Sequence, residues 1–311
     1  MPNQPHNWGR WGDDDQQGAL NHLTPATVLA ALGAARDGRV LSLAMPIKGA
    51  TSGPAPSTVP HLAGRPLPQH FMSIDGGDYA AGARAAGARI ADDALVLSPH
   101  GTTTHMDALC HMWAGETLYN GHPAARVRSY GAARLGIEHA AARGVVARGV
   151  LLDAAAHRGV PHLRATDRIG AGELAAICAR DGTEPGPGDV AVIRTGWPRV
   201  WAADPALYRS GQPGLAADAG RWLAERDVVM VAMDNAAIQG LDGDGRSGED
   251  VEDDLHLTLL WRNGIHLAEM LWLDRLAEAA AEGRRTDFLF IAVPLPIEGG
   301  TGSPINPVAV L

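Results

Sequence analysis

The sequence predicts an α/β fold, because segments with the composition of buried strands alternate with segments of helical periodicity along the chain. The composition agrees: 46% of the 311 residues are hydrophobic and 20% are charged, as in globular proteins with a sizeable core. No Pro/Ser-rich linker divides the sequence. We therefore expect a single domain over residues 1–311, with an extended N-terminal segment at about residues 1–24.

The first half of the chain begins with a predicted helix. Thr24 can cap this helix and Pro25 suits its first position, and apolar residues then follow at helical spacing. The Gly-, Pro- and Ser-rich residues 48–70 predict a long loop, which in a compact domain is often functional. The ranges expected here are a helix over 24–35 and strands over 40–47 and 94–97.

The second half continues the alternation and ends in a Gly/Pro-rich tail at 298–311. Long apolar runs bounded by Gly, Asp or Asn indicate buried strands, and Ala/Leu-rich runs indicate helices. The predicted strands are 149–157, 188–197, 228–235 and 286–297, the predicted helices are 168–182 and 219–227, and residues 253–283 hold at least one further helix.

Charge, cysteine content and hydropathy narrow the class of protein. The net charge is −9 and the pI is about 5.8, without a Lys/Arg cluster, which argues against a nucleic-acid partner. No run reaches the ~18–20 apolar residues of a membrane span, and the N-terminus lacks the apolar core of a secretory signal. Cys110 and Cys178 are too few for a disulfide scaffold. We expect a soluble cytoplasmic protein with two free thiols.

Three histidines and an aspartate gather in "SPHGTTTHMDALCHMW", residues 98–113. In an extended segment His105 and Asp107 point to the same side. If the chain then enters a helix near Asp107, His111 shares a face with Asp107. Imidazole and carboxylate ligands suit Zn²⁺, with Mn²⁺ or Fe²⁺ as competitors, and the lack of a thiolate cage favours a site that keeps a position open for water.

Two other interpretations of this stretch stay open. The residues can be polar members of a Thr-rich turn, bonded to the nearby backbone. Cys110 is a conceivable nucleophile, although it is adjacent to His111 and adjacent residues rarely face each other in a strand or a helix.

The stretch "HGTTTHMDALCH" resembles the signature of the putative cyclase family, which includes bacterial kynurenine formamidases and isatin hydrolases. Further segments are similar to those of the longer family members, in matching order over about residues 8–310. They are "LLDAAAHRG", "PGPGDVAVIRTGW", "HLTLLWRNGIHLAEML" and "GGTGSPINPVAV".

The resemblance implies a swivelling β/β/α domain that forms homo-oligomers, dimers or tetramers, and binds one or two ions, Zn²⁺ or Mn²⁺. By motif, His105 and Asp107 become metal ligands, His111 becomes the general acid/base, and His256 and Glu269 become a second ligand pair. The family pattern has its first histidine four residues before His105.

That position is Gly101 here, and His100 lies one residue earlier. Since a strand reverses its side-chain face at each residue, His100 reaches the ion only if a bulge or a glycine turn at Gly101 restores its direction. The family's proline before the last histidine is replaced as well, by Leu109.

Glu269 has a physical reason to find a partner, because a buried glutamate is costly unless it is paired or metal-bound. His266 is a rival for that role, since the two would share a face on a helix. Trp8, Trp11 and Trp113 are candidates for an aromatic wall around a flat substrate, or for ordinary packing.

Taken together, these residues favour a metal-dependent amidohydrolase that cleaves a formamide or lactam C–N bond in a small molecule, aromatic compounds among them. Metal-activated water would attack, and His111 would protonate the leaving nitrogen. One alternative is a metal-assisted cyclase or lyase acting on a polyketide-like carbonyl compound. Another is a non-catalytic binding protein with a relic site, which the nearly complete ligand set argues against.

Overall fold

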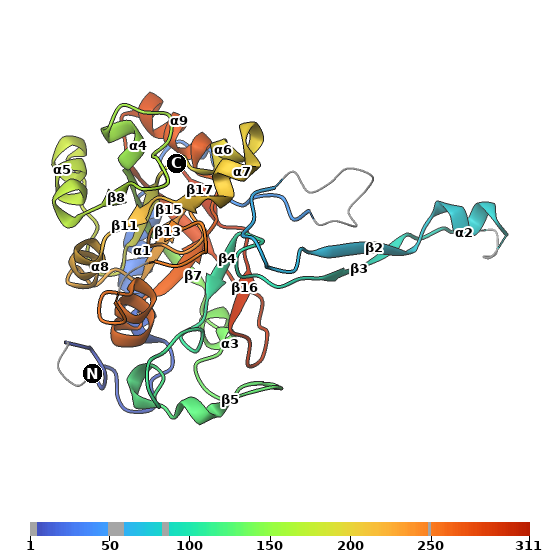
Figure 1. Ribbon diagram of the computed structural model, residues 1–311, viewed down its shortest axis with the longest axis horizontal. Helices are drawn as coiled ribbons and strands as arrows, with labels where there is room; N and C mark the ends of the chain where they lie inside the picture. Colours follow the sequence, from blue (N-terminus) through green and yellow to red (C-terminus); the bar gives the residue numbers. More distant parts are fainter. Residues whose placement is uncertain (1–4, 49–58, 83–86, 248–249) are drawn as a thin grey trace.

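A nine-stranded mixed sheet forms the centre of the computed structural model, which describes residues 5–48, 59–82, 87–247 and 250–311 (Figure 1). The strand order is β1-β17-β15-β7-β9-β12-β14-β4-β16. Neighbours among the four central strands, β7, β9, β12 and β14, run parallel, and the strands outside them pair antiparallel. The bounds are β1 (Val40–Ser42), β4 (His105–Asp107), β7 (Val145–Asp153), β9 (Val190–Arg194), β12 (Met230–Met233), β14 (His266–Glu269), β15 (Asp287–Ala292), β16 (Gly302–Pro304) and β17 (Val308–Val310).

The α/β prediction is confirmed, and the central strands explain why it could be made. β9, β12 and β14 are buried along their whole length, as parallel strands covered by helices are. Figure 1 shows α4, α5 and α8 together on one side of the sheet, with α6, α7 and α9 at one end. The helices are α1 (Pro25–Leu32), α3 (Ile137–Ala141), α4 (Ala154–His157), α5 (Ala171–Asp181), α6 (Pro198–Ala203), α7 (Pro205–Arg209), α8 (Ala217–Ala224) and α9 (Asp274–Gly283).

Helix α1 begins as the sequence predicts. The Thr24 hydroxyl accepts a hydrogen bond from the backbone N–H of Thr27 at 3.2 Å, with Pro25 at the first helical position. This cap satisfies one of the four N–H groups that a helix start leaves without a partner.

The segment before the histidines is placed differently from the prediction. The expected strand at 94–97 exists as β3 (Asp92–Val96), but it is largely exposed instead of being a buried sheet strand. It pairs with β2 (Gln69–Ile74), and the two strands project from the body with α2 (Gly76–Ala80) near the tip (Figure 1). An apolar run of only four residues does not determine which strand it pairs with or whether it is buried. Residues 49–58 of the predicted loop lie outside the described part of the chain.

Three further strand ends were wrong, among them that of the strand expected over 286–297, which ends at Ala292. The strand expected over 149–157 ends at Asp153, whose carboxylate caps α4 through the N–H of Ala156 at 2.8 Å. The strand expected over 40–47 ends at Ser42. The Gly/Pro-rich tail at 298–311, for which no strand was predicted, contributes β16 and β17, which lie far apart in the sheet order.

Residues 253–283 contain the predicted helix α9, but also two elements that were not expected. The π-helix η4 (Leu257–Arg262) comes first, and β14 follows it inside the sheet. Short single-turn helices are η1 (Gly18–His22), η2 (Tyr119–Gly121) and η3 (Ala124–Arg126), and two-residue strands are β5 (Val127–Arg128), β6 (Gly131–Ala132), β8 (Arg168–Ile169), β10 (Gly211–Gln212), β11 (Gly214–Leu215) and β13 (Leu241–Asp242). Within the described ranges, none of the helices has both the length and the apolar character to span a membrane.

Candidate metal centre

Two neighbouring strands bring the first three predicted ligands together. His105 and Asp107 are the first and last residues of β4, so their side chains lie on the same face. In the antiparallel pairing with β14, Glu269 lies directly opposite His105. Cross-strand partners hold their side chains side by side, and the Nε2 atom of His105 lies 3.4 Å from Oε2 of Glu269 and 3.6 Å from Oδ1 of Asp107.

His256, the residue immediately before η4, also lies in this group. Asp254 stabilises the start of the helical segment, because its carboxylate accepts the N–H of Leu257 at 3.0 Å. The Nε2 atom of His256 lies 3.3 Å from Oε1 of Glu269 and 3.7 Å from Oδ2 of Asp107. The candidate metal centre is therefore defined here as His105, Asp107, His256 and Glu269, with His100 and His111 beside it.

His100 is brought to the centre by the glycine that follows it. Gly101 has φ +75°, in the left-handed region that glycine adopts easily, and the turn directs Nδ1 of His100 to 3.0 Å from Oδ1 of Asp107. The Thr301 hydroxyl is hydrogen-bonded to the other ring nitrogen of His100 at 3.1 Å. Sequence reasoning missed Thr301, because it lies 201 residues from His100 and no local pattern indicates that the two side chains meet.

His111 reaches the centre through a turn, and the helix expected after Asp107 is absent. The N–H of His111 donates to the carbonyl of Ala108 at 2.9 Å. Its ring stacks on that of His100, with centroids 3.9 Å apart and planes inclined by 8°. One possible ligand atom from each of His100, Asp107 and His111 lies within 4.8 Å of the other two, so His111 is close enough to contact a cation held here.

The buried polar atoms of the centre match the needs of a cation. Nδ1 of His100, Nε2 of His105, both oxygens of Asp107 and Oε1 of Glu269 are buried and have no hydrogen-bond partner. The nitrogen–oxygen separations that His105 and His256 make with Asp107 and Glu269 are 3.3–3.7 Å, which is long for hydrogen bonds, whereas Nδ1 of His100 lies closer to Asp107, at 3.0 Å. Two ligands of a tetrahedral ion at ~2.1 Å each lie about 3.4 Å apart. The residues present therefore fit a divalent metal ion.

The protonation of His105 supports the same conclusion. Its Nδ1–H donates to the carbonyl of Thr103 at 2.7 Å, because a carbonyl can only accept. That hydrogen bond leaves the lone pair of Nε2 directed at two carboxylates, unless a proton or a cation lies between them. The second ring nitrogen of a metal-binding histidine is typically held in this way.

Electrostatics separate the roles of the residues. Burial alone would raise the pKa of Asp107, but His111, His100 and His105 hold it far below its usual range. Burial opposes the charge on His256, yet Glu269 and Asp107 raise its pKa to about 9. For His111 burial dominates and lowers the pKa to about 4. Without a cation, the cluster thus holds anionic Asp107 and a neutral His111 at pH 7.

The structure does not support the two alternative roles considered from the sequence, His266 as the partner of Glu269 and Cys110 as a nucleophile. His266 and Glu269 lie on a strand, where residues three apart face opposite sides, instead of on the expected helix. Burial lowers the pKa of His266 to about 3. The Cys110 thiol approaches the carbonyl of Gly300 at 3.7 Å, and burial raises its pKa to about 12, so it is protonated at neutral pH. Both cysteines are free.

The three tryptophans lie in different environments. The indole N–H of Trp8 donates to the carbonyl of Trp261 at 2.8 Å. Trp11 meets His22 edge to face at 5.3 Å. Trp113 follows His111 by two residues and is 36% exposed. Of the three, Trp113 is the one that lies close in sequence to a residue beside the centre, His111. Its contact with a substrate stays a prediction.

Gly302 packs directly against the His100 imidazole, so a larger residue at this position should disturb it. A methyl group at Gly302 would lie 2.7 Å from Cε1 of His100 and 2.8 Å from the backbone oxygen of Met106. We expect Gly302→Ala to displace the imidazole or β16, to weaken metal binding by at least about tenfold and to lower the free energy of unfolding by about 1–3 kcal/mol. Metal titration and chemical denaturation measure the two effects.

Gly172→Ala is the matched control, because it lies within α5 with open space around it. This substitution is expected to leave metal binding unchanged and to be neutral or stabilising. Equal metal affinity of Gly302→Ala and the wild type would contradict the packing argument.

Comparisons with known proteins show which family this chain resembles. The family model described as putative cyclase matches residues 41–239. A crystal structure of a novel cyclase is similar over 99% of this chain and 100% of its own, at 35% identity and a TM-score of 0.88. No match was found among curated proteins.

More distant structures share the fold. An isatin hydrolase bound to the product analogue thioisatinate covers 93% of this chain and 99% of its own, at 21% identity and a TM-score of 0.63. A predicted metal-dependent hydrolase from Bacillus stearothermophilus covers 87% and 97%, at 18% identity and a TM-score of 0.52. With the family model matched and one relative similar over nearly its whole length, the chain belongs to the putative cyclase family.

Proposed function

We propose that this protein is a metal-dependent hydrolase that cleaves a C–N amide bond, in a formamide or a lactam, of a small molecule. One observation carries the proposal: buried, unpartnered nitrogen and oxygen atoms of His100, His105, Asp107 and Glu269 converge at separations that suit a shared cation. A structural site would close around the ion. Here His100 and His111 are less buried than His105, Asp107 and Glu269, so solvent meets the group at these two residues.

His105, Asp107, His256 and Glu269 would hold the ion, with His100 as a further ligand. Nitrogen and carboxylate oxygen ligands favour Zn²⁺, and Mn²⁺ is the second choice. When bound, such an ion polarises a carbonyl and lowers the pKa of water toward ~7.

His111 is suited to move the proton. Its depressed pKa, about 4, keeps the imidazole neutral at pH 7, so it can accept a proton from the attacking water. It can then donate that proton to the leaving nitrogen, which is a poor leaving group until it is protonated. Stacking on His100 fixes the plane of the ring, which restricts the direction of transfer.

The structural neighbours give the proposal its substrate class. One of them is named an isatin hydrolase and was crystallised with thioisatinate, and isatin is a cyclic amide. A metal-assisted cyclase or lyase acting on a polyketide-like carbonyl compound is the second candidate, supported by the family's description. Hydrolysis adds one water to the mass of the substrate, whereas cyclisation removes water or leaves the mass unchanged.

Metal analysis combined with a substrate screen tests this function. We expect the purified protein to contain one or two divalent ions per chain and to hydrolyse at least one compound among N-formylkynurenine, isatin and small lactams. Treatment with a chelator should abolish the turnover, and added Zn²⁺ or Mn²⁺ should restore it. Turnover that persists in fully metal-free protein would contradict the proposal, and a product lacking the added water would favour the cyclase.

A further inference from the structure

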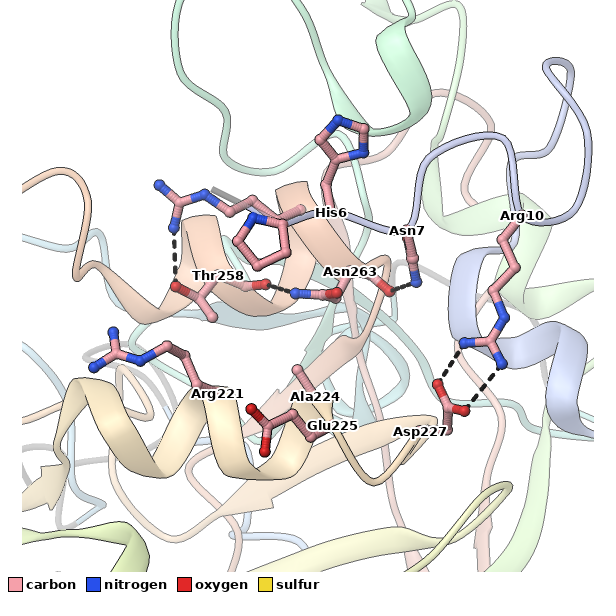
Figure 2. Close-up of a pocket in the computed structure, with 11 residues that line it drawn as sticks. His6, Asn7, Arg10, Arg221, Ala224, Glu225, Asp227, Thr258 and Asn263 are labelled. Carbon is pink, nitrogen blue, oxygen red and sulfur yellow. Dashed lines mark hydrogen bonds and ion pairs between the residues drawn. The ribbon is translucent and has the colours of Figure 1, made fainter. Parts of the chain in front are cut away.

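A cavity lies apart from the metal centre, between the N-terminal segment, α8 and η4 (Figure 2). Its volume is about 460 Å³, within the range of pockets that hold small ligands. None of the six residues in and beside the metal centre lines it. The charged residues among its lining are Arg10, Arg221, Glu225, Asp227 and Arg262.

Two of the three guanidinium groups are already paired with carboxylates. Arg10 forms two hydrogen bonds with Asp227 at the right of Figure 2, one of them 2.9 Å long. Arg221 on α8 pairs with Asp253 at 2.9 Å, and about half of its side chain is exposed. These two cations have their charges compensated by the protein.

Arg262 differs from them. It is only 4% exposed, and its Nη1 donates to two neutral acceptors, the carbonyl of Glu252 and the hydroxyl of Thr258, both at 3.0 Å. Among the described residues, no carboxylate lies within ion-pair distance of Arg262, and its Nε and Nη2 have no hydrogen-bond acceptor.

A buried cation without a counter-ion is costly. Burial lowers the pKa of Arg262, and the more distant Glu252, Asp254 and Asp253 oppose this effect only in part. Arg262 is thus the one guanidinium of the lining that has no carboxylate partner within ion-pair distance among the described residues, whereas Arg10 and Arg221 each have one. It is also the most buried of the three.

We propose that this cavity binds a small organic monocarboxylate, with the carboxylate paired to Arg262 and the apolar body against Pro5 and Ala224. A guanidinium with two free N–H groups offers the fork that a carboxylate fits. Pro5 and Ala224 line the same cavity and supply apolar surface. Glu225 lines the same cavity, and its carboxylate disfavours a dianion. This inference does not depend on the proposed reaction.

Calorimetry with benzoate and the metal-loaded protein tests the site. We expect saturable binding that Arg262→Met weakens at least tenfold. Ala224→Trp should weaken it similarly by filling the cavity, and this variant leaves Arg262 intact in case Arg262→Met fails to fold. Arg226→Met is the matched control, because Arg226 pairs with Glu184, stacks on Trp222 and does not line the cavity. Its affinity for benzoate should stay within about twofold of the wild type.

Crystals soaked in 4-bromobenzoate locate the ligand independently. The proposal expects the anomalous signal of bromine in the cavity, with the carboxylate within hydrogen-bond distance of Arg262. Bromine found solely at the metal centre, or benzoate affinity that is unchanged in both Arg262→Met and Ala224→Trp, would overturn it.

Discussion

Asp107→Asn is expected to lose the metal ion and to lower kcat/KM by about 10³-fold or more, which corresponds to roughly 4 kcal/mol of transition-state stabilisation. Asp107 is fully buried, and neither of its oxygens has a hydrogen-bond partner. Nitrogen atoms of His100, His105 and His256 lie 3.0, 3.6 and 3.7 Å from them. Asparagine keeps the shape but removes the charge that attracts the ion.

Metal content by elemental analysis and steady-state kinetics measure the result. Asp14→Asn is the control, since the Asp14 side chain is 96% exposed and its nearest cation, Arg134, is 3.9 Å away. The control should retain both metal and activity. An Asp107→Asn protein that binds metal as tightly as the wild type would show that the carboxylate is not a ligand.

His111→Ala is expected to retain the metal ion but to lose about 10²–10⁴-fold in kcat, the usual contribution of a positioned acid/base group. The wild-type rate should also respond to pH in a specific way. Because burial lowers the pKa of His111 to about 4, the neutral form that accepts a proton is present at pH 7 and remains so down to about pH 5. Activity that depends on this form should decline only near pH 4, and the variant should lack that decline.

His157→Ala is the matched control, because His157 is an exposed residue at the end of α4. Added imidazole should partly restore the rate of His111→Ala and should not affect the control. If His111→Ala loses the metal, His111 is a ligand in the group that it forms with His100 and Asp107. Unchanged turnover would reject the role in proton transfer.

Local pattern was enough to predict the fold class and part of the candidate site. The strands β9, β12 and β15 each contain a continuous apolar run of at least four residues, and such runs identify buried strands whatever their neighbours. The alternation of faces within a strand likewise predicted that His105 and Asp107 would share a side, and β4 places them so. Glu269 was expected to have a partner on the ground of its burial alone, and it faces His105 and His256.

Other features depended on contacts between distant segments. β16 and β17 are three-residue strands in a Gly/Pro-rich tail, and their hydrogen bonds come from partners far away in the chain. β3 includes the apolar residues 94–96 yet extends from the body. Propensity and periodicity report on a short window, so neither could place these segments.

The sequence by itself determined which chemistry is available: imidazoles and carboxylates without a thiolate cage, at spacings that suit a strand. Only the tertiary structure decided which of them meet. The β4–β14 register sets Glu269 opposite His105, the turn at Gly101 directs His100 to Asp107, and a loop brings His111 onto His100. The unpaired charge of Arg262 also arises only in the fold. The physical reason is that register, turns and burial are set by contacts between segments that are remote in sequence.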